Sequence, residues 1–143
     1  MPPTHVLVPL DGSPLADDAL DHALETYDCR VTVLNVVTPL DSSMSEGGVL
    51  DGVGDREATA REHANDLIAD AKRRAEAAGR SVETAVETGD PAETIVAFVD
   101  DHDVNHVVMG GHGGTRNELA SRLLGTVATA VVGEAPVSVT VVR

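Results

Sequence analysis

The sequence predicts a single α/β domain built on a five-stranded, doubly wound parallel sheet with helices on both faces. Five short apolar or β-branched segments alternate with four segments of helical periodicity, and this βαβ repetition calls for parallel strands joined by right-handed crossovers. A chain of 143 residues is the length of one domain, residues 1–143, and is large enough to bury a core. The expected strands are residues 5–10, 31–37, 81–88, 105–109 and 137–142.

The first strand is expected to end in a turn that begins a helix. Residues 5–10 form a continuous apolar run, which is typical of a parallel strand buried on both faces. In the turn that follows, Ser13 is a good N-cap and Pro14 suits the first helical position, so Ser13 is interpreted as a cap and not as a nucleophile. Asp11 is therefore expected at the carboxyl tip of the first strand.

The middle of the chain combines a long aperiodic segment with a long helix. Residues 31–37 are rich in β-branched residues, as strands are. Residues 38–54 have no period, and a loop of that length is often a lid or a binding loop. From about 55 to 78 a stripe repeats every 3.6 residues, and Gly79 is expected to end this helix. Residues 81–88 alternate apolar with charged side chains, as an edge strand would.

A glycine-rich turn after the fourth strand is the expected functional centre. Residues 107–109 lead into Gly-Gly-His-Gly-Gly at 110–114, and an apolar helical pattern resumes at Leu119. Such a turn lets backbone N–H groups approach an anion, and the positive end of the helix favours a phosphate. The Gly125-Thr126 pair is expected inside the helical pattern, where glycine costs about 1 kcal/mol relative to alanine. Glycine at that position suggests that a ligand comes close.

Two interpretations of this turn stay open. Glycines are common in strand-to-helix turns that bind nothing, and neither a Walker loop nor a G-x-G-x-x-G pattern is present. His112 either donates to a phosphate or faces solvent as a turn residue. With strand order 3-2-1-4-5, ligands bind outside the carboxyl ends of the first and fourth strands. That order brings residues 9–11 beside Met109 and Gly110.

The charge balance excludes several classes of partner. The chain has 24 acidic and 10 basic residues, for a net charge of -14, which argues against nucleic acid and against anionic membranes as partners. A surface of this kind suits a salt-rich cytoplasm, as in halophiles. Cys29 is the single cysteine and fits a reducing compartment. With no long apolar run and no signal peptide, the expected location is the cytoplasm.

The histidines offer weaker candidates. His5, His22 and His63 are expected at the surface. His102 and His106 flank Asp103, which is interpreted as a solvated strand entrance and not as a metal site, because no H-x3-H spacing or nearby cysteine supports a metal.

Five motifs, in order along the whole chain, resemble those of the universal stress protein family. They are Val8-Pro9-Leu10-Asp11-Gly12-Ser13, Gly89-Asp90-Pro91, Val108-Met109-Gly110-Gly111-His112-Gly113, Leu124-Gly125-Thr126 and the closing strand of residues 137–143. The resemblance implies a 3-2-1-4-5 sandwich, usually a homodimer, and in one branch ATP binding through G-x2-G-x9-G-S/T.

The resemblance also implies roles for individual residues. Pro9, Leu10 and Asp11 would line the adenosine end, and Val36 would meet adenine through its backbone. The residues that would hold ribose and phosphates are Met109, Gly110, Gly113, Gly125 and Thr126. The Asp11 carboxylate would serve a ribose hydroxyl or Mg²⁺. Eleven residues separate Gly113 from Gly125, where the family pattern has nine, and this predicts a longer loop beside the phosphates.

Two functions follow as expectations. The first is a stress-response regulatory protein that binds ATP or another adenine nucleotide with little or no turnover, since no positioned general base is visible. The alternative is an interaction module that binds no nucleotide and acts through its dimer surface. In either case residues 137–142 are expected to join two copies, because this edge strand carries no charge, proline or bulge to block pairing.

Overall fold

The computed structural model describes residues 2–39, 51–112 and 124–143, except for the side chains of 51–57. Its five strands form one parallel sheet in the order β3-β2-β1-β4-β5, which confirms the predicted architecture. The strands are β1 (His5–Pro9), β2 (Arg30–Val37), β3 (Glu83–Thr88), β4 (His106–Gly110) and β5 (Ser138–Val142). The helices are α1 (Pro14–Thr26), α2 (Asp51–Ala77), α3 (Pro91–Asp101) and α4 (Thr126–Glu134).

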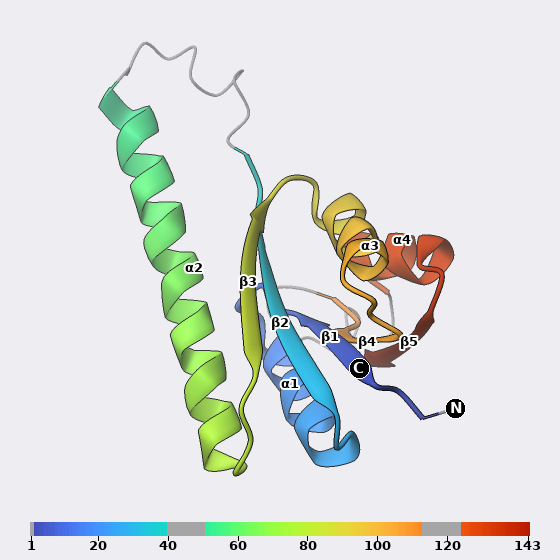
Figure 1. The fold of residues 1–143 in the computed structure, drawn as a ribbon. Coiled ribbons are helices and arrows are strands. Elements are labelled where there is room, and N and C mark those ends of the chain that lie inside the picture. The colour runs from blue at the N-terminus through green and yellow to red at the C-terminus, as the bar shows by residue number, and fades with distance from the viewer. Residues whose placement is uncertain (1, 40–50, 113–123) are drawn as a thin grey trace.

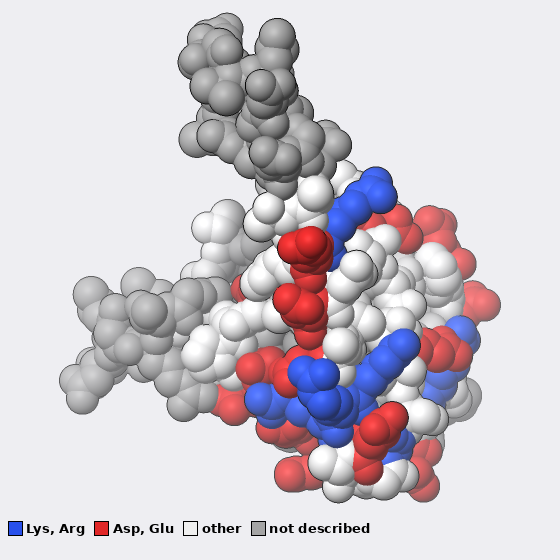
Figure 2. All heavy atoms as spheres, turned by 90° about the vertical axis from the view of Figure 1, so that its left-hand side faces the viewer, with Lys and Arg blue, Asp and Glu red and all other residues white. Residues whose placement is uncertain are grey.

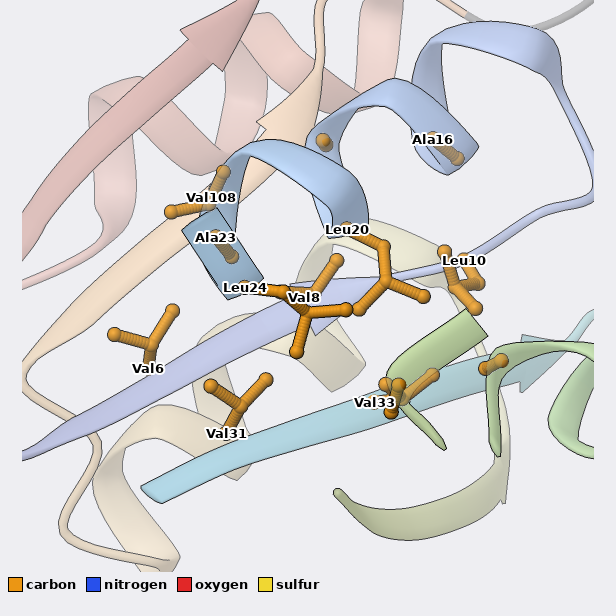
Figure 3. Packing of buried hydrophobic residues seen from close by; sticks show 13 residues of the cluster. Val6, Val8, Leu10, Ala16, Leu20, Ala23, Leu24, Val31, Val33 and Val108 are labelled. Atoms are coloured by element: carbon orange, nitrogen blue, oxygen red, sulfur yellow. The ribbon is translucent and has the colours of Figure 1, made fainter. Parts of the chain in front are cut away.

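The helices cover the sheet in two layers, with α1 and α2 on one face and α3 and α4 on the other (Figure 1). Alternate residues of β1 point to opposite faces, so Val6 and Val8 pack with α1 and α2 while Leu7 packs with α3 and α4. Figure 3 shows the first of these two cores, in which Leu20 and Leu24 of α1 lie over β1. The central strand is therefore buried on both faces, as its apolar run predicts.

The turn between β1 and α1 has the predicted cap. The Ser13 hydroxyl oxygen accepts a hydrogen bond from the Ala16 N–H over 3.3 Å, and Asp11 Oδ1 accepts one from the Ser13 N–H over 2.9 Å. Gly12 has φ +84°, a conformation that glycine adopts easily. A Cβ at this position would also lie 3.3 Å from Leu67 Cδ2 of α2. The turn is thus held by its own hydrogen bonds and by the packing of α2 against Gly12.

Several element boundaries differ from those expected. Helix α2 begins at Asp51, so the last residues of the expected loop 38–54 are helical, and β3 begins at Glu83 instead of residue 81. The largest difference concerns Gly125, which is the N-cap of α4, with φ −67° and ψ 168°, and not an interior helical residue. The expected helical start at Leu119 lies outside the described residues.

The end of α2 is tied to the turn between α1 and β2 by one arginine. Gly79 has φ +73°, and α2 ends just before it, as predicted. The guanidinium of Arg80 donates to three carbonyl oxygens, those of Leu24, Tyr27 and Cys29, each over 2.8 Å. The Leu24 carbonyl belongs to the last turn of α1, and those of Tyr27 and Cys29 follow the helix, where helical hydrogen bonds run out. Arg80 therefore completes the hydrogen bonding of a turn that belongs to another element.

His5 is buried, and the prediction of a surface position is wrong. Its side chain is only 4% exposed, with Nε2 at 2.7 Å from Thr32 Oγ1 and Nδ1 at 3.0 Å from the carbonyl oxygen of His102. Burial is the main cause that lowers the pKa of His5. His5 is the first residue of the central strand β1, as the expected strand 5–10 has it, and the hydrogen bonds of its ring to Thr32 and His102 allow a polar side chain to be buried there.

Acidic and basic side chains are mixed on the face that α2 presents (Figure 2). Arg74 of α2 lies 3.5 Å from Asp17 and 3.1 Å from Asp21 of α1, so its guanidinium joins the two helices through two carboxylates, and it also lies 3.4 Å from Asp70 of its own helix. Within the described ranges, no helix is long and apolar enough to cross a membrane.

We expect salt to stabilise the fold, because a net charge of -14 makes the compact chain repel itself. Raising KCl from about 0.1 M to about 1 M shortens the Debye length from roughly 10 Å to roughly 3 Å. Thermal melts should therefore show a higher midpoint in molar KCl. An unchanged or lower midpoint would contradict the expectation, and KCl is preferred to sulfate because sulfate stabilises most proteins by exclusion.

Candidate functional site

A cavity of about 500 Å³ opens at the carboxyl edge of the sheet. The tips of β1, β2 and β4 line its floor, and its walls come from the starts of α1, α3 and α4 and from residues 60–63 of α2. This is the edge at which parallel α/β sheets bind ligands, beside the point where strand order reverses between β1 and β4.

Nine of the ten residues predicted for the site line this one cavity. They are Pro9, Leu10, Asp11, Val36, Met109, Gly110, His112, Gly125 and Thr126. The tenth, Gly113, lies outside the described residues, as does the segment of extra residues that follows it. Residues more than a hundred positions apart in the chain thus meet at one edge because the strand order places β4 beside β1.

The glycine at the end of β4 is explained by its packing against α1. A Cβ on Gly110 would lie 2.9 Å from the Leu15 carbonyl carbon and 3.0 Å from the Ala16 nitrogen, which is closer than real Cβ atoms approach backbone. Helix α1 can therefore start against the tip of β4 only because residue 110 has no side chain. The packing of α1 on β4 alone therefore explains a glycine at residue 110, without reference to a ligand in the cavity.

The start of α4 is held beside the β4 tip by backbone hydrogen bonds. The Gly125 N–H donates to the Gly111 carbonyl over 2.6 Å, and the Gly111 N–H donates to the Val142 carbonyl over 2.7 Å. A Cβ on Gly125 would lie 3.1 Å from His112 Cα, so a side chain at this junction would crowd the backbone of His112. The N-cap Gly125 provides no side-chain cap, and the first turn of α4, residues 126–128, lines the cavity.

This arrangement gives one end of the cavity a positive character. The first N–H groups of a helix have no partner within the helix, and the helix dipole adds to their attraction for anions. On the other side of β1, the cavity is lined by Val36 and Val37 at the tip of β2, and by Pro91 and Ile95 of α3. The cavity therefore combines an anion-attracting end with an apolar end.

Four polar residues that line the cavity were not predicted for the site, namely Ser13, Asn35, Thr38 and His63. Asn35 is 6% exposed, and its Nδ2 donates to the Leu10 carbonyl over 2.7 Å. Its position as a polar residue within the mostly apolar run 31–37 is the sequence signal that could have indicated a functional role. His63 is exposed on α2, and its Nε2 lies 3.7 Å from the position of a Cβ on Gly12. Helical spacing places His63 one turn after Ala60, but it does not indicate that this turn reaches the tip of β1.

The described residues contain no group of three or more His, Cys, Asp and Glu side chains that would hold a metal ion. Asp11 lines the cavity with one carboxylate, and its Oδ1 already accepts the Ser13 N–H. One carboxylate fits Mg²⁺ that is held mainly by phosphate oxygens and water, and does not fit a metal site made of protein ligands alone.

Comparison with known proteins identifies the family. The model of the universal stress protein family matches residues 3–143. The chain belongs to the universal stress protein family. A search of curated proteins finds no match.

Solved structures of this family share the fold. The chain superposes on the universal stress protein UspA from Lactobacillus plantarum with a TM-score of 0.82 at 23% identity, covering 100% of this chain and 99% of that one. A universal stress protein from Archaeoglobus fulgidus, solved with dAMP, gives 0.69 at 21%, covering 100% of both chains. One from Arabidopsis thaliana, solved with AMP, gives 0.69 at 19%, covering 98% and 91%.

Proposed function

We propose that this universal stress protein binds an adenine nucleotide in the cavity at the carboxyl edge and acts as a regulatory protein with little or no turnover. The observation that carries the proposal is the division of the cavity into an anion-attracting end at α4 and an apolar end at β2 and α3. A nucleotide has the same division between phosphates and base. The AMP and dAMP bound by the two family structures above support the same ligand class.

The proposed ligand is ATP with Mg²⁺. Thr126 and the N–H groups of the first turn of α4 would hold phosphate oxygens, and Asp11 would contact a ribose hydroxyl or the metal ion. Gly113, outside the described residues, would add a backbone N–H. When bound, Mg²⁺ would neutralise part of the phosphate charge in a strongly acidic protein.

The proposal of little turnover rests on what lines the cavity. Among the described lining residues, the titratable side chains are Asp11, His63 and His112, and none is an arginine or lysine that would stabilise a phosphoryl transition state. Arg116 and Arg122 lie outside the described residues.

Titration calorimetry in high salt tests the proposal. ATP, ADP and AMP are each titrated with Mg²⁺ and with EDTA, and guanine nucleotides serve as the matched control. We expect saturable binding of adenine nucleotides, strengthened by Mg²⁺ for ATP. No binding of any adenine nucleotide would overturn the proposal. Phosphate release measured on the same samples separates a binding protein from a hydrolase.

The alternative is an interaction module that leaves the cavity without a nucleotide. Both proposals include a homodimer that pairs through β5, the strand at the edge of the sheet. Absence of nucleotide binding together with a dimer would favour this alternative.

A further inference from the structure

Asn35 is a buried amide placed where the tips of β1 and β2 meet. The Leu10 N–H donates to the Leu34 carbonyl over 2.8 Å, which continues the pairing of the two strands by one residue. The Leu10 carbonyl, just beyond the end of β1, instead accepts from Asn35 Nδ2 over 2.7 Å. The Asn35 side chain thus continues the hydrogen bonding between β1 and β2 at the floor of the cavity.

The Leu10 carbonyl has few other ways to be satisfied. Leu10 is 4% exposed, and a buried carbonyl oxygen without a donor is costly, so the chain would have to turn to reach water. Asp11 follows directly, with its Oδ1 fixed by the Ser13 N–H and with Gly12 held at φ +84°. The direction of the Leu10 carbonyl therefore determines where the whole turn, including the Asp11 carboxylate, lies.

We propose that Asn35 is a positioning residue of the nucleotide site, acting through the Leu10 carbonyl to hold Asp11 at the cavity. The inference rests on the proposed function, and it assigns to Asn35 a role through another residue and not a contact with the ligand. Thr32, on the same strand, offers a comparison, because it is also buried and hydrogen-bonded but does not line the cavity.

The test uses Asn35→Asp, which keeps the shape of the side chain and makes its donor depend on pH. At about pH 7.5 the introduced carboxylate has no proton to donate and repels the Leu10 oxygen. At about pH 5 a buried carboxyl facing a carbonyl is expected to be protonated, since burial raises its pKa above the usual value of about 3.9. It then donates as the amide does.

AMP is the probe, in EDTA and constant salt, and each affinity is divided by that of the unmodified protein at the same pH. This ratio removes the effect of Asp11, His63 and His112, the described titratable groups that line the same cavity. We expect Asn35→Asp to bind AMP at least about tenfold more weakly at pH 7.5, and within about threefold of the unmodified protein at pH 5.

Two further variants separate positioning from stability. Asn35→Ala should bind AMP more weakly than the unmodified protein by a similar factor at both pH values. If thermal melts show that Asn35→Asp is unfolded at pH 7.5, the AMP affinity of Asn35→Ala tests the positioning role instead. Thr32→Val removes a buried hydrogen bond from the same strand and should leave AMP affinity within about twofold. A pH-independent Asn35→Asp, an Asn35→Ala with unchanged affinity, or an equal loss in Thr32→Val would each overturn the inference.

The failure of the proposed function gives a different result. In that case the unmodified protein binds no AMP, ADP or ATP at either pH, and the inference falls with it. If the unmodified protein binds and the Asn35 variants bind equally well, the function stands and the positioning role is wrong.

Discussion

Replacing Thr126 by aspartate is expected to weaken AMP binding at least about tenfold, or about 1.4 kcal/mol, while leaving the fold as stable as before. Thr126 is the first residue of α4, is exposed, and lines the cavity. A carboxylate in the first turn is favourable for a helix, because it faces the positive end of the dipole. The same charge occupies the place proposed for a phosphate. Binding should therefore weaken without a loss of stability.

Thr129→Asp is the matched control for this experiment. Thr129 is exposed on the same helix, three residues further on, and does not line the cavity. Calorimetry should show AMP binding close to that of the unmodified protein, and adenosine, which has no phosphate, should bind Thr126→Asp with little loss. Equal AMP binding by Thr126→Asp and the unmodified protein would contradict a phosphate at the start of α4.

Replacing Val139 by proline is expected to separate a dimer into folded monomers. The Val142 carbonyl accepts from Gly111, so the backbone groups of residues 138, 140 and 142 face β4, while those of Val139 and Val141 face the open edge. Proline at Val139 removes an N–H from the open edge and leaves the bonds to β4 in place. Proline is tolerated on an edge strand with its missing donor toward solvent, but not in the middle of a sheet that continues into a second copy.

Light scattering in high salt measures the outcome. The unmodified protein should have the mass of a dimer at micromolar concentration, Val139→Thr should keep it because the backbone donor remains, and Val139→Pro should have the mass of a monomer with a cooperative thermal melt. A monomer mass for the unmodified protein would refute pairing through β5.

The fold was predictable because its signals are local. Apolar runs of strand length, the Ser13 cap, and the glycine that ends α2 each depend on a few neighbouring residues, and the alternation of strands and helices then determines a parallel sheet. The strand tips that meet at the cavity follow from that order, which is why so many of the predicted site residues lie together.

The errors concern residues whose environment comes from distant parts of the chain. His5 is buried by contacts with Thr32 and His102, which no local pattern reveals. Gly125 is predicted inside a helix because apolar periodicity continues across it, but a backbone hydrogen bond holds it beside Gly111, and α4 begins only at the next residue. His63 reaches the cavity because α2 packs on the turn at Gly12, which helical spacing alone does not indicate.

The three carbonyls bound by Arg80 also constrain the order in which this chain can fold. They lie 51 to 56 residues before the arginine, so the last turn of α1 stays incomplete until the whole of β2 and α2 has been placed. Closing a segment of that length costs conformational entropy, so we expect the Arg80 contacts to form late in folding, together with other non-local contacts. A lysine at position 80 could not make the same three hydrogen bonds, because it lacks the planar, forked set of N–H donors of the guanidinium. In refolding experiments, Arg80→Lys should therefore speed unfolding more than it slows folding, because the contact forms after the main barrier.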